Sequence, residues 1–188
     1  RLLDFNIGRL MEIAKEGGWY DNTIFVMFGD HNTRISQIPH LPPAFEKLGL
    51  ESNAVPMLIH APKLLQPKVI EEAVGLADLL PTVLGMAGMA FDNGAMGRDI
   101  QQPAPEGERV VPLVLREGTF PLIGGVTKDF LLQMQHDGTQ PTLHDLASHT
   151  PLDDVADQHP EEFKRMEELT RGLHEASRLM LYQNVRKD

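Results

Sequence analysis

The order of apolar and polar residues predicts a helix followed by a buried strand at the start of the chain. Apolar residues recur at helical spacing at Leu3, Ile7, Leu10 and Ala14. This pattern predicts a helix over about 2–15 that ends at Gly17-Gly18. A continuous apolar run over 24–28 then predicts a short strand that is covered on both faces. A helix, a short connection and a buried strand are typical of an α/β domain.

The middle of the chain continues this arrangement with a second strand and a capped helix. Residues 55–60 form another short apolar run, and the segment 44–48 is compatible with a short helix that stops at Gly49. Asp78 precedes an apolar helical stripe and can accept backbone N–H groups as its N-cap. Pro81 then falls in the first turn, where its missing N–H has no intrahelical partner. We therefore interpret Asp78 as structural rather than catalytic.

The pattern changes after a segment rich in Gly, Pro, Asp and Gln over 91–108. Short apolar runs separated by turn residues predict strands over 110–115, 121–126, 130–135 and 142–146. Their close spacing favours an antiparallel sheet. A final helix begins at Pro160 and keeps one apolar face that should pack on this sheet. We predict two regions: 1–105, an α/β core, and 106–188, a small antiparallel sheet with a helix.

Composition excludes several classes of protein. The chain has 188 residues, 41% of them hydrophobic, which argues against a disordered chain. Its net charge of −10 argues against nucleic acid as a partner. It contains no cysteine, so disulfides and thiolate metal sites are excluded. No apolar run approaches the roughly 20 residues of a membrane helix, and no signal peptide is visible. Because Arg1 lies inside an apolar pattern, we expect a fragment of a longer chain.

The candidate chemistry lies directly after the first predicted strand. Gly29 is followed by Asp30 and His31, a carboxylate beside an imidazole. Ligands in open α/β sheets sit beyond the carboxyl ends of strands, and this pair of oxygen and nitrogen donors suits a divalent metal. The alternative interpretation is an ordinary hydrogen-bonded pair at a strand end, which is the commoner role of an adjacent Asp and His.

Three further residues are candidates for binding. The loop over 32–43 follows the Asp30–His31 pair, so Arg34 and His40 could face an anionic substrate, or could simply be solvated. His60 ends the second strand and could be a ligand, although a core or rim histidine is the commoner case. His136, His144, His149 and His159 match no ligand spacing, and we interpret them as surface residues.

Five motifs in order resemble the sulfatase family of the alkaline phosphatase superfamily. They are the segments 18–31, 55–62, 77–88, 97–100 and 143–146. The Gly-Asp-His form at 29–31 is most similar to the membrane-anchored phosphoglycerol transferases, including lipoteichoic-acid synthases. The resemblance implies a partial alkaline-phosphatase-like sandwich, with a mostly parallel sheet and helices, before the antiparallel region.

The resemblance also implies a function. Asp30 and His31 would be two ligands of a divalent metal, Mn²⁺ first, with Mg²⁺, Zn²⁺ or Ca²⁺ as alternatives. The substrate would be an anionic phosphate or sulfate ester, and the full-length protein would be membrane-anchored on the extracytoplasmic, periplasmic side. The family's nucleophile and remaining ligands come from an N-terminal half, and no position here can inherit the nucleophile. The chain alone should therefore be inactive.

A competing hypothesis is a non-catalytic binding or assembly domain that keeps the sulfatase-like fold. In either case, removal of the neighbouring strands would expose sheet edges and faces, so we expect self-association of the chain.

Overall fold

The computed structural model describes residues 1–32, 41–103, 109–116, 119 and 121–183. By their contacts these residues form two compact units, one of 1–30 and 55–69 and the other of 31–54 and 70–188. Each unit is described by itself. The division at 105/106 that the composition suggests stays a prediction.

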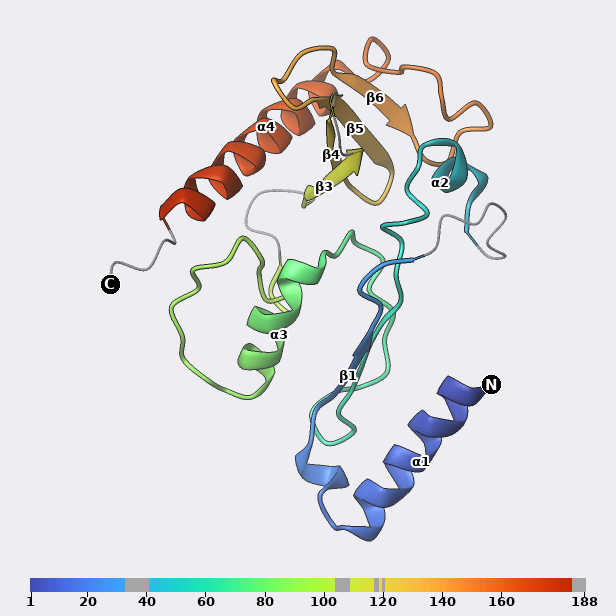
Figure 1. Cartoon of the computed structure of the whole chain (residues 1–188), viewed down its shortest axis with the longest axis vertical. Coiled ribbons are helices and arrows are strands. Elements are labelled where there is room, and N and C mark those ends of the chain that lie inside the picture. Colours follow the sequence, from blue (N-terminus) through green and yellow to red (C-terminus); the bar gives the residue numbers. More distant parts are fainter. Residues whose placement is uncertain (33–40, 104–108, 117–118, 120, 184–188) are drawn as a thin grey trace. The chain divides into compact units, whose positions relative to one another are not determined.

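The first unit contains one long helix and a two-stranded sheet, which Figure 1 shows in blue and teal. Helix α1 spans Leu2–Glu16 and ends at Gly17, as predicted. Of its residues only Ala14 is buried, whereas Leu2, Leu3 and Phe5 are 75%, 73% and 68% exposed. A helix with this much exposed apolar surface is typical of one that packs against further polypeptide.

The predicted mostly parallel sheet is wrong for the strands that the structure describes. Strand β1 (Phe25–Phe28) pairs antiparallel with β2 (Met57–His60), with Phe25 opposite His60 and Phe28 opposite Met57. An apolar run predicts a strand but not the direction of its partner, because direction depends on the connection. In the described residues of this connection the helix is α2 (Pro43–Lys47), which belongs to the other unit, and no crossover helix is seen there.

Coverage of β1 on both faces is also not seen within the described residues. Phe25 is 7% exposed, but Phe28 on β1 and Leu58 on β2 are 48% and 58% exposed. The faces of this small sheet therefore carry apolar side chains in contact with solvent.

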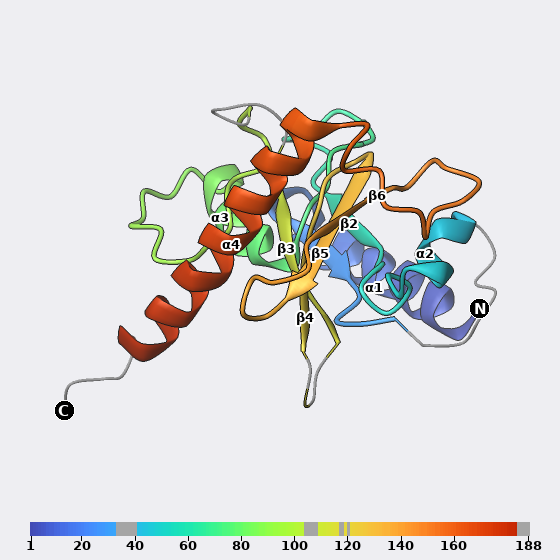
Figure 2. The ribbon, with the colours of Figure 1, turned by 90° about the horizontal axis from the view of Figure 1, so that it is seen from above.

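The second unit contains the predicted antiparallel sheet. Its strands are hydrogen-bonded in the order β3-β4-β5-β6, and all three pairs are antiparallel. Their bounds are Val111–Arg116, Leu122–Val126, Phe130–Gln135 and Thr142–Asp145. Figure 2 shows this sheet from above, with α4 (Pro160–Gln183) crossing it.

Helix α4 packs its apolar face on this sheet, as predicted. Met166 is fully buried in a core cluster with Leu132, Met134 and Leu143. The helix comes close to β4 at Gly125, where an added Cβ would collide with the Thr170 hydroxyl oxygen. Position 125 therefore has no room for a larger side chain.

The interpretation of His144 as a surface residue is wrong. His144 on β6 is 4% exposed, and its Nδ1 lies 3.0 Å from the Pro151 carbonyl oxygen. Its Nε2 lies 3.0 Å from the Gln133 side-chain nitrogen and 3.0 Å from the Thr142 hydroxyl. These partners satisfy both ring nitrogens of a neutral imidazole, which is how a buried polar group avoids a desolvation cost.

Asp78 is a structural residue that acts differently from the predicted cap. Helix α3 spans Leu79–Met86, after a 3₁₀ turn at Leu76–Asp78, and Asp78 is only 1% exposed. Its carboxylate accepts the N–H groups of Gly75 at 2.9 Å and Arg98 at 2.8 Å, and it forms an ion pair with Arg109. It therefore connects three backbone segments instead of capping its own helix.

We predict that Asp78→Asn lowers the free energy of unfolding by about 3–5 kcal/mol, because it leaves Arg109 with an uncompensated buried charge. An amide also places N–H donors where the carboxylate accepts two backbone N–H groups. Urea denaturation followed by circular dichroism measures the effect. The matched control is Asp92→Asn, at an exposed position, which should change stability little. A loss below about 1 kcal/mol for Asp78→Asn would contradict this role.

Candidate metal-ligand pair

The candidate site is built where β1 ends. Gly29 donates its N–H to the Pro56 carbonyl oxygen at 3.1 Å, which continues the β1–β2 pairing by one residue. A Cβ at position 29 would lie 3.1 Å from the Val55 Cβ, tighter than ordinary contact. Glycine therefore allows the close approach, and the chain continues into Asp30 and His31, both exposed.

The residue after the pair fixes the backbone. Asn32 donates its N–H to the Ser52 carbonyl at 3.0 Å and its side-chain amide to the Ala54 carbonyl at 2.8 Å. Both partners lie in the segment that leads into β2, so Asn32 holds the start of the loop against it. Sequence reasoning missed this role. The available signal was an asparagine, a residue that commonly bonds backbone groups in loops, directly after the candidate ligands.

The contacts of His31 favour one ring nitrogen as a ligand. Its Nδ1 lies 3.2 Å from the Asn32 carbonyl oxygen. A carbonyl only accepts hydrogen bonds, so this contact requires a proton on Nδ1 and leaves the lone pair on Nε2. Metal-binding histidines commonly hold their second nitrogen in this way. The exposed Asp30 carboxylate and an Nε2 lone pair together suit a divalent ion such as Mn²⁺.

His60 lies at the wrong end of the sheet to join this pair. Because β1 and β2 are antiparallel, His60 is opposite Phe25, at the start of β1, while Asp30 follows the end of β1. The Nε2 of His60 lies 2.6 Å from the Tyr20 hydroxyl, and its ring packs beside Phe25. His60 is therefore a packed rim residue, which is the commoner role that the sequence suggested.

Arg34 and His40 lie outside the described residues. Among the residues that the structure describes, no group of three or more His, Asp or Glu side chains is arranged to hold a metal ion. The assignment of Asp30 and His31 as metal ligands stays a prediction. In the described part of the chain, no helix is long and apolar enough to span a membrane.

The comparison with family models falls on the segment that carries this pair. Residues 1–89 match the sulfatase family model. This segment of the chain is therefore similar to sulfatases, and the match includes β1, Asp30, His31, β2 and α3.

Individual relatives align with different lengths of this chain. An endo-4-O-sulfatase of Bacteroides thetaiotaomicron is 32% identical over 88 residues, which is 46% of this chain. A lipoteichoic acid synthase-like protein, YvgJ of Bacillus subtilis, is 29% identical over 143 residues, which is 70% of this chain. The chain spans only 17% and 21% of these two relatives.

A solved structure extends the similarity of fold to nearly the whole chain. YidJ of Bacteroides fragilis, described as a sulfatase, superposes with a TM-score of 0.71 over 93% of this chain and 40% of its own length. At 20% identity this comparison shows the fold alone. The mixed α/β arrangement with antiparallel sheets and a C-terminal helix is therefore that of sulfatase-fold proteins.

We predict that the 188-residue chain binds Mn²⁺ weakly at Asp30 and His31, and that binding weakens as pH falls. The sign follows because His31 must be neutral to ligate, so protons compete with the metal. Paramagnetic broadening of amide resonances during a Mn²⁺ titration, at about pH 7.5 and about pH 5, measures both effects.

Asp30→Asn with His31→Gln should abolish the local broadening, while the exposed control Asp92→Asn should leave it unchanged. Equal broadening in the double variant would show that these residues are not ligands.

Proposed function

We propose that this chain is part of a metal-dependent enzyme that hydrolyses or transfers a phosphate or sulfate ester, in which Asp30 and His31 bind the metal. The observation that carries the proposal is the sulfatase family match over 1–89, which includes an exposed carboxylate and imidazole directly after a strand. The relatives are an endo-4-O-sulfatase and a lipoteichoic acid synthase-like protein, so sulfate and phosphate esters are the substrate classes to consider.

The chemistry of such esters explains the roles of the residues. Negative charge on the non-bridging oxygens must be neutralised, and a bound divalent ion supplies this charge and activates a nucleophile. Asp30 and the Nε2 of His31 would hold the ion, and Asn32 would position His31 by anchoring the backbone beside it. Arg34 and His40, in the segment that follows, are our candidates for contacts with the anionic substrate.

Transfer of phosphoglycerol is the form of this activity that we favour. The Gly-Asp-His sequence at 29–31 resembles the phosphoglycerol transferases. The lipoteichoic acid synthase-like relative matches 70% of the chain, but an N-acetylglucosamine-6-O-sulfatase matches 63%, so the preference rests on the sequence at 29–31. A sulfatase activity is the alternative. With transfer we also propose an extracytoplasmic location in a membrane-anchored full-length protein.

The exposed apolar surface of the first unit fits this proposal. Leu2, Leu3 and Phe5 on α1, with Phe28 and Leu58 on the sheet, are each more than 40% exposed. We propose that they pack against the part of the sulfatase fold that supplies the nucleophile and further metal ligands. Self-association of the isolated chain through the same surface stays a prediction.

A second candidate function is a non-catalytic binding or assembly domain with the sulfatase fold. One observation favours it: the described residues offer no third ligand beside Asp30 and His31. On this alternative, the pair would be an ordinary hydrogen-bonded strand end, and its substitution would leave the function of the full-length protein unchanged.

An activity assay on the full-length protein separates these functions. We expect Asp30→Asn to lower kcat/KM for an ester substrate by more than about 100-fold, because it removes a ligand charge, and Asp92→Asn to have no effect. Chromogenic phosphodiester, phosphomonoester and sulfate-ester substrates distinguish the activities. Unchanged activity in Asp30→Asn would exclude the ligand role. The 188-residue chain alone should hydrolyse none of them, and turnover above the Asp30→Asn background would contradict the proposal.

A further inference from the structure

Helix α2 ends in a local motif that fixes the position of Leu50. Gly49 follows the helix with a φ of 70°, a conformation that favours glycine, and donates its N–H to the Glu46 carbonyl oxygen at 3.2 Å. Leu50 donates its N–H to the Phe45 carbonyl oxygen at 2.8 Å. These two bonds around a left-handed glycine are a Schellman motif, in which the residue after the glycine also makes an apolar contact with the helix. The end of α2 therefore holds Leu50 through its backbone.

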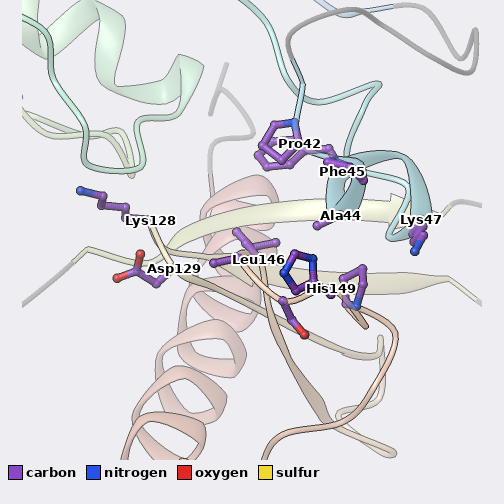
Figure 3. Close-up of a pocket in the computed structure, with 12 residues that line it drawn as sticks. Pro42, Ala44, Phe45, Lys47, Lys128, Asp129, Leu146 and His149 are labelled. Carbon is purple, nitrogen blue, oxygen red and sulfur yellow. The ribbon is translucent and has the colours of Figure 1, made fainter.

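The side chain of Leu50 is buried against the antiparallel sheet. Leu50 is 2% exposed and packs in one core cluster with Leu131 of β5 and Leu146 after β6. Ala44 of α2 belongs to the same cluster. Figure 3 shows Ala44 and Leu146 on facing elements, beside the pocket that both residues line. The sheet and α2 together set the position of Leu50, and all of these residues lie within the second unit.

Leu50 begins a turn that holds the residue after the candidate ligands. Its carbonyl oxygen accepts the N–H groups of Asn53 and Ala54, each at 3.0 Å. In the same turn, the Ser52 carbonyl oxygen accepts the backbone N–H of Asn32 at 3.0 Å. The Ala54 carbonyl oxygen accepts the side-chain amide of Asn32 at 2.8 Å. Asn32 is therefore restrained at both its backbone and its side chain.

This series of contacts ends at the imidazole of His31. The Nδ1 of His31 lies 3.2 Å from the Asn32 carbonyl oxygen, so the proton is on Nδ1 and the lone pair is on Nε2. An unrestrained imidazole in water favours the opposite tautomer, with its proton on Nε2. The carbonyl oxygen of Asn32 therefore selects the tautomer in which Nε2 can bind a metal, as the partners of histidine ligands commonly do.

We propose that Gly49 and Leu50 are positioning residues for His31, because they join the antiparallel sheet to the turn that restrains Asn32. The packing of Leu50 fixes the turn over 50–54, the turn restrains Asn32, and Asn32 selects the tautomer of His31. The role of His31 as a metal ligand rests on the proposed function, whereas the control of its tautomer does not. The sheet thereby determines which ring nitrogen of His31 is free to bind a metal.

The end of α3 offers a matched control. Gly88 follows α3 with a φ of 68°, and Met89 donates its N–H to the Leu84 carbonyl oxygen at 3.0 Å, as in the motif that ends α2. A Cβ added at Gly49 or at Gly88 would meet no atom within 4 Å, so alanine introduces backbone strain alone at both positions. The two alanine variants carry a similar local cost, but Gly49 adjoins the turn that holds Asn32.

The tautomer of His31 is measured without a metal. Long-range ¹H–¹⁵N spectra of the 188-residue chain at about pH 8, above the usual titration range of histidine, report which ring nitrogen carries the proton. We expect Nδ1–H to predominate in the wild-type chain and in Gly88→Ala, and Nε2–H in Gly49→Ala and Leu50→Ala. Leu50→Met, which nearly conserves volume, should retain Nδ1–H. Nε2–H as the major wild-type tautomer, or the same tautomer in Gly49→Ala and Gly88→Ala, overturns the proposal.

Mn²⁺ titrations of the full-length protein separate this inference from the proposed function. Gly49→Ala should raise the dissociation constant for Mn²⁺ about tenfold, with kcat restored by excess Mn²⁺, whereas Gly88→Ala should change neither quantity. A shifted tautomer in Gly49→Ala with an unchanged dissociation constant contradicts the metal-ligand role of His31 but supports the positioning role. An unshifted tautomer overturns the positioning role, whatever the Mn²⁺ affinity. A dispersed amide spectrum confirms that each variant is folded.

Discussion

The second unit depends on one buried carboxylate. Asp78 accepts backbone N–H groups from Gly75 and Arg98 and pairs with Arg109, whose side chain is only 12% exposed. A buried charge is tolerated only where such partners compensate for its lost hydration. Arg109 leads into β3 and Asp78 precedes α3, so this contact joins the end of the sulfatase-like segment to the antiparallel sheet. The Asp78 side chain makes no capping hydrogen bond to α3, because its carboxylate binds these other partners.

The sheet that Asp78 helps to anchor contributes to two hydrophobic cores. Leu131 on β5 pairs with Val126 in the sheet and packs with Ala44 of α2 and with Leu146 in one core. On the opposite side, Met166 of α4 completes a second core. Because both faces of this small sheet pack in a core, its strands carry apolar residues at defined positions, and the sequence pattern predicts them.

Local pattern was enough to predict the elements but not how they pair. The runs at 121–126 and 130–135, with turn residues between them, predicted two antiparallel strands that the structure confirms. The equally clear run at 24–28 predicted β1, but the partner β2 comes almost thirty residues later, and its antiparallel direction is set by contacts that no local pattern records. His144 was misjudged for a related reason: its partners are Gln133 on the neighbouring strand and the loop carbonyl of Pro151, and the spacing of apolar residues records neither contact.

The candidate ligands could be identified from the sequence because Asp30 and His31 are adjacent and directly follow a predicted strand. The contacts that position these two residues could not be predicted from the sequence. The contact of Gly29 with Val55 and the bonds of Asn32 to Ser52 and Ala54 depend on the return of the chain before β2.

The most direct test of the central claim is a crystal structure of the full-length protein grown with Mn²⁺, with anomalous diffraction recorded at the manganese edge. The account predicts an anomalous peak in contact with the Asp30 carboxylate and the Nε2 of His31, completed by ligands from outside this chain. A manganese peak held by other residues, with Asp30 and His31 bonded only to protein or solvent, would contradict it.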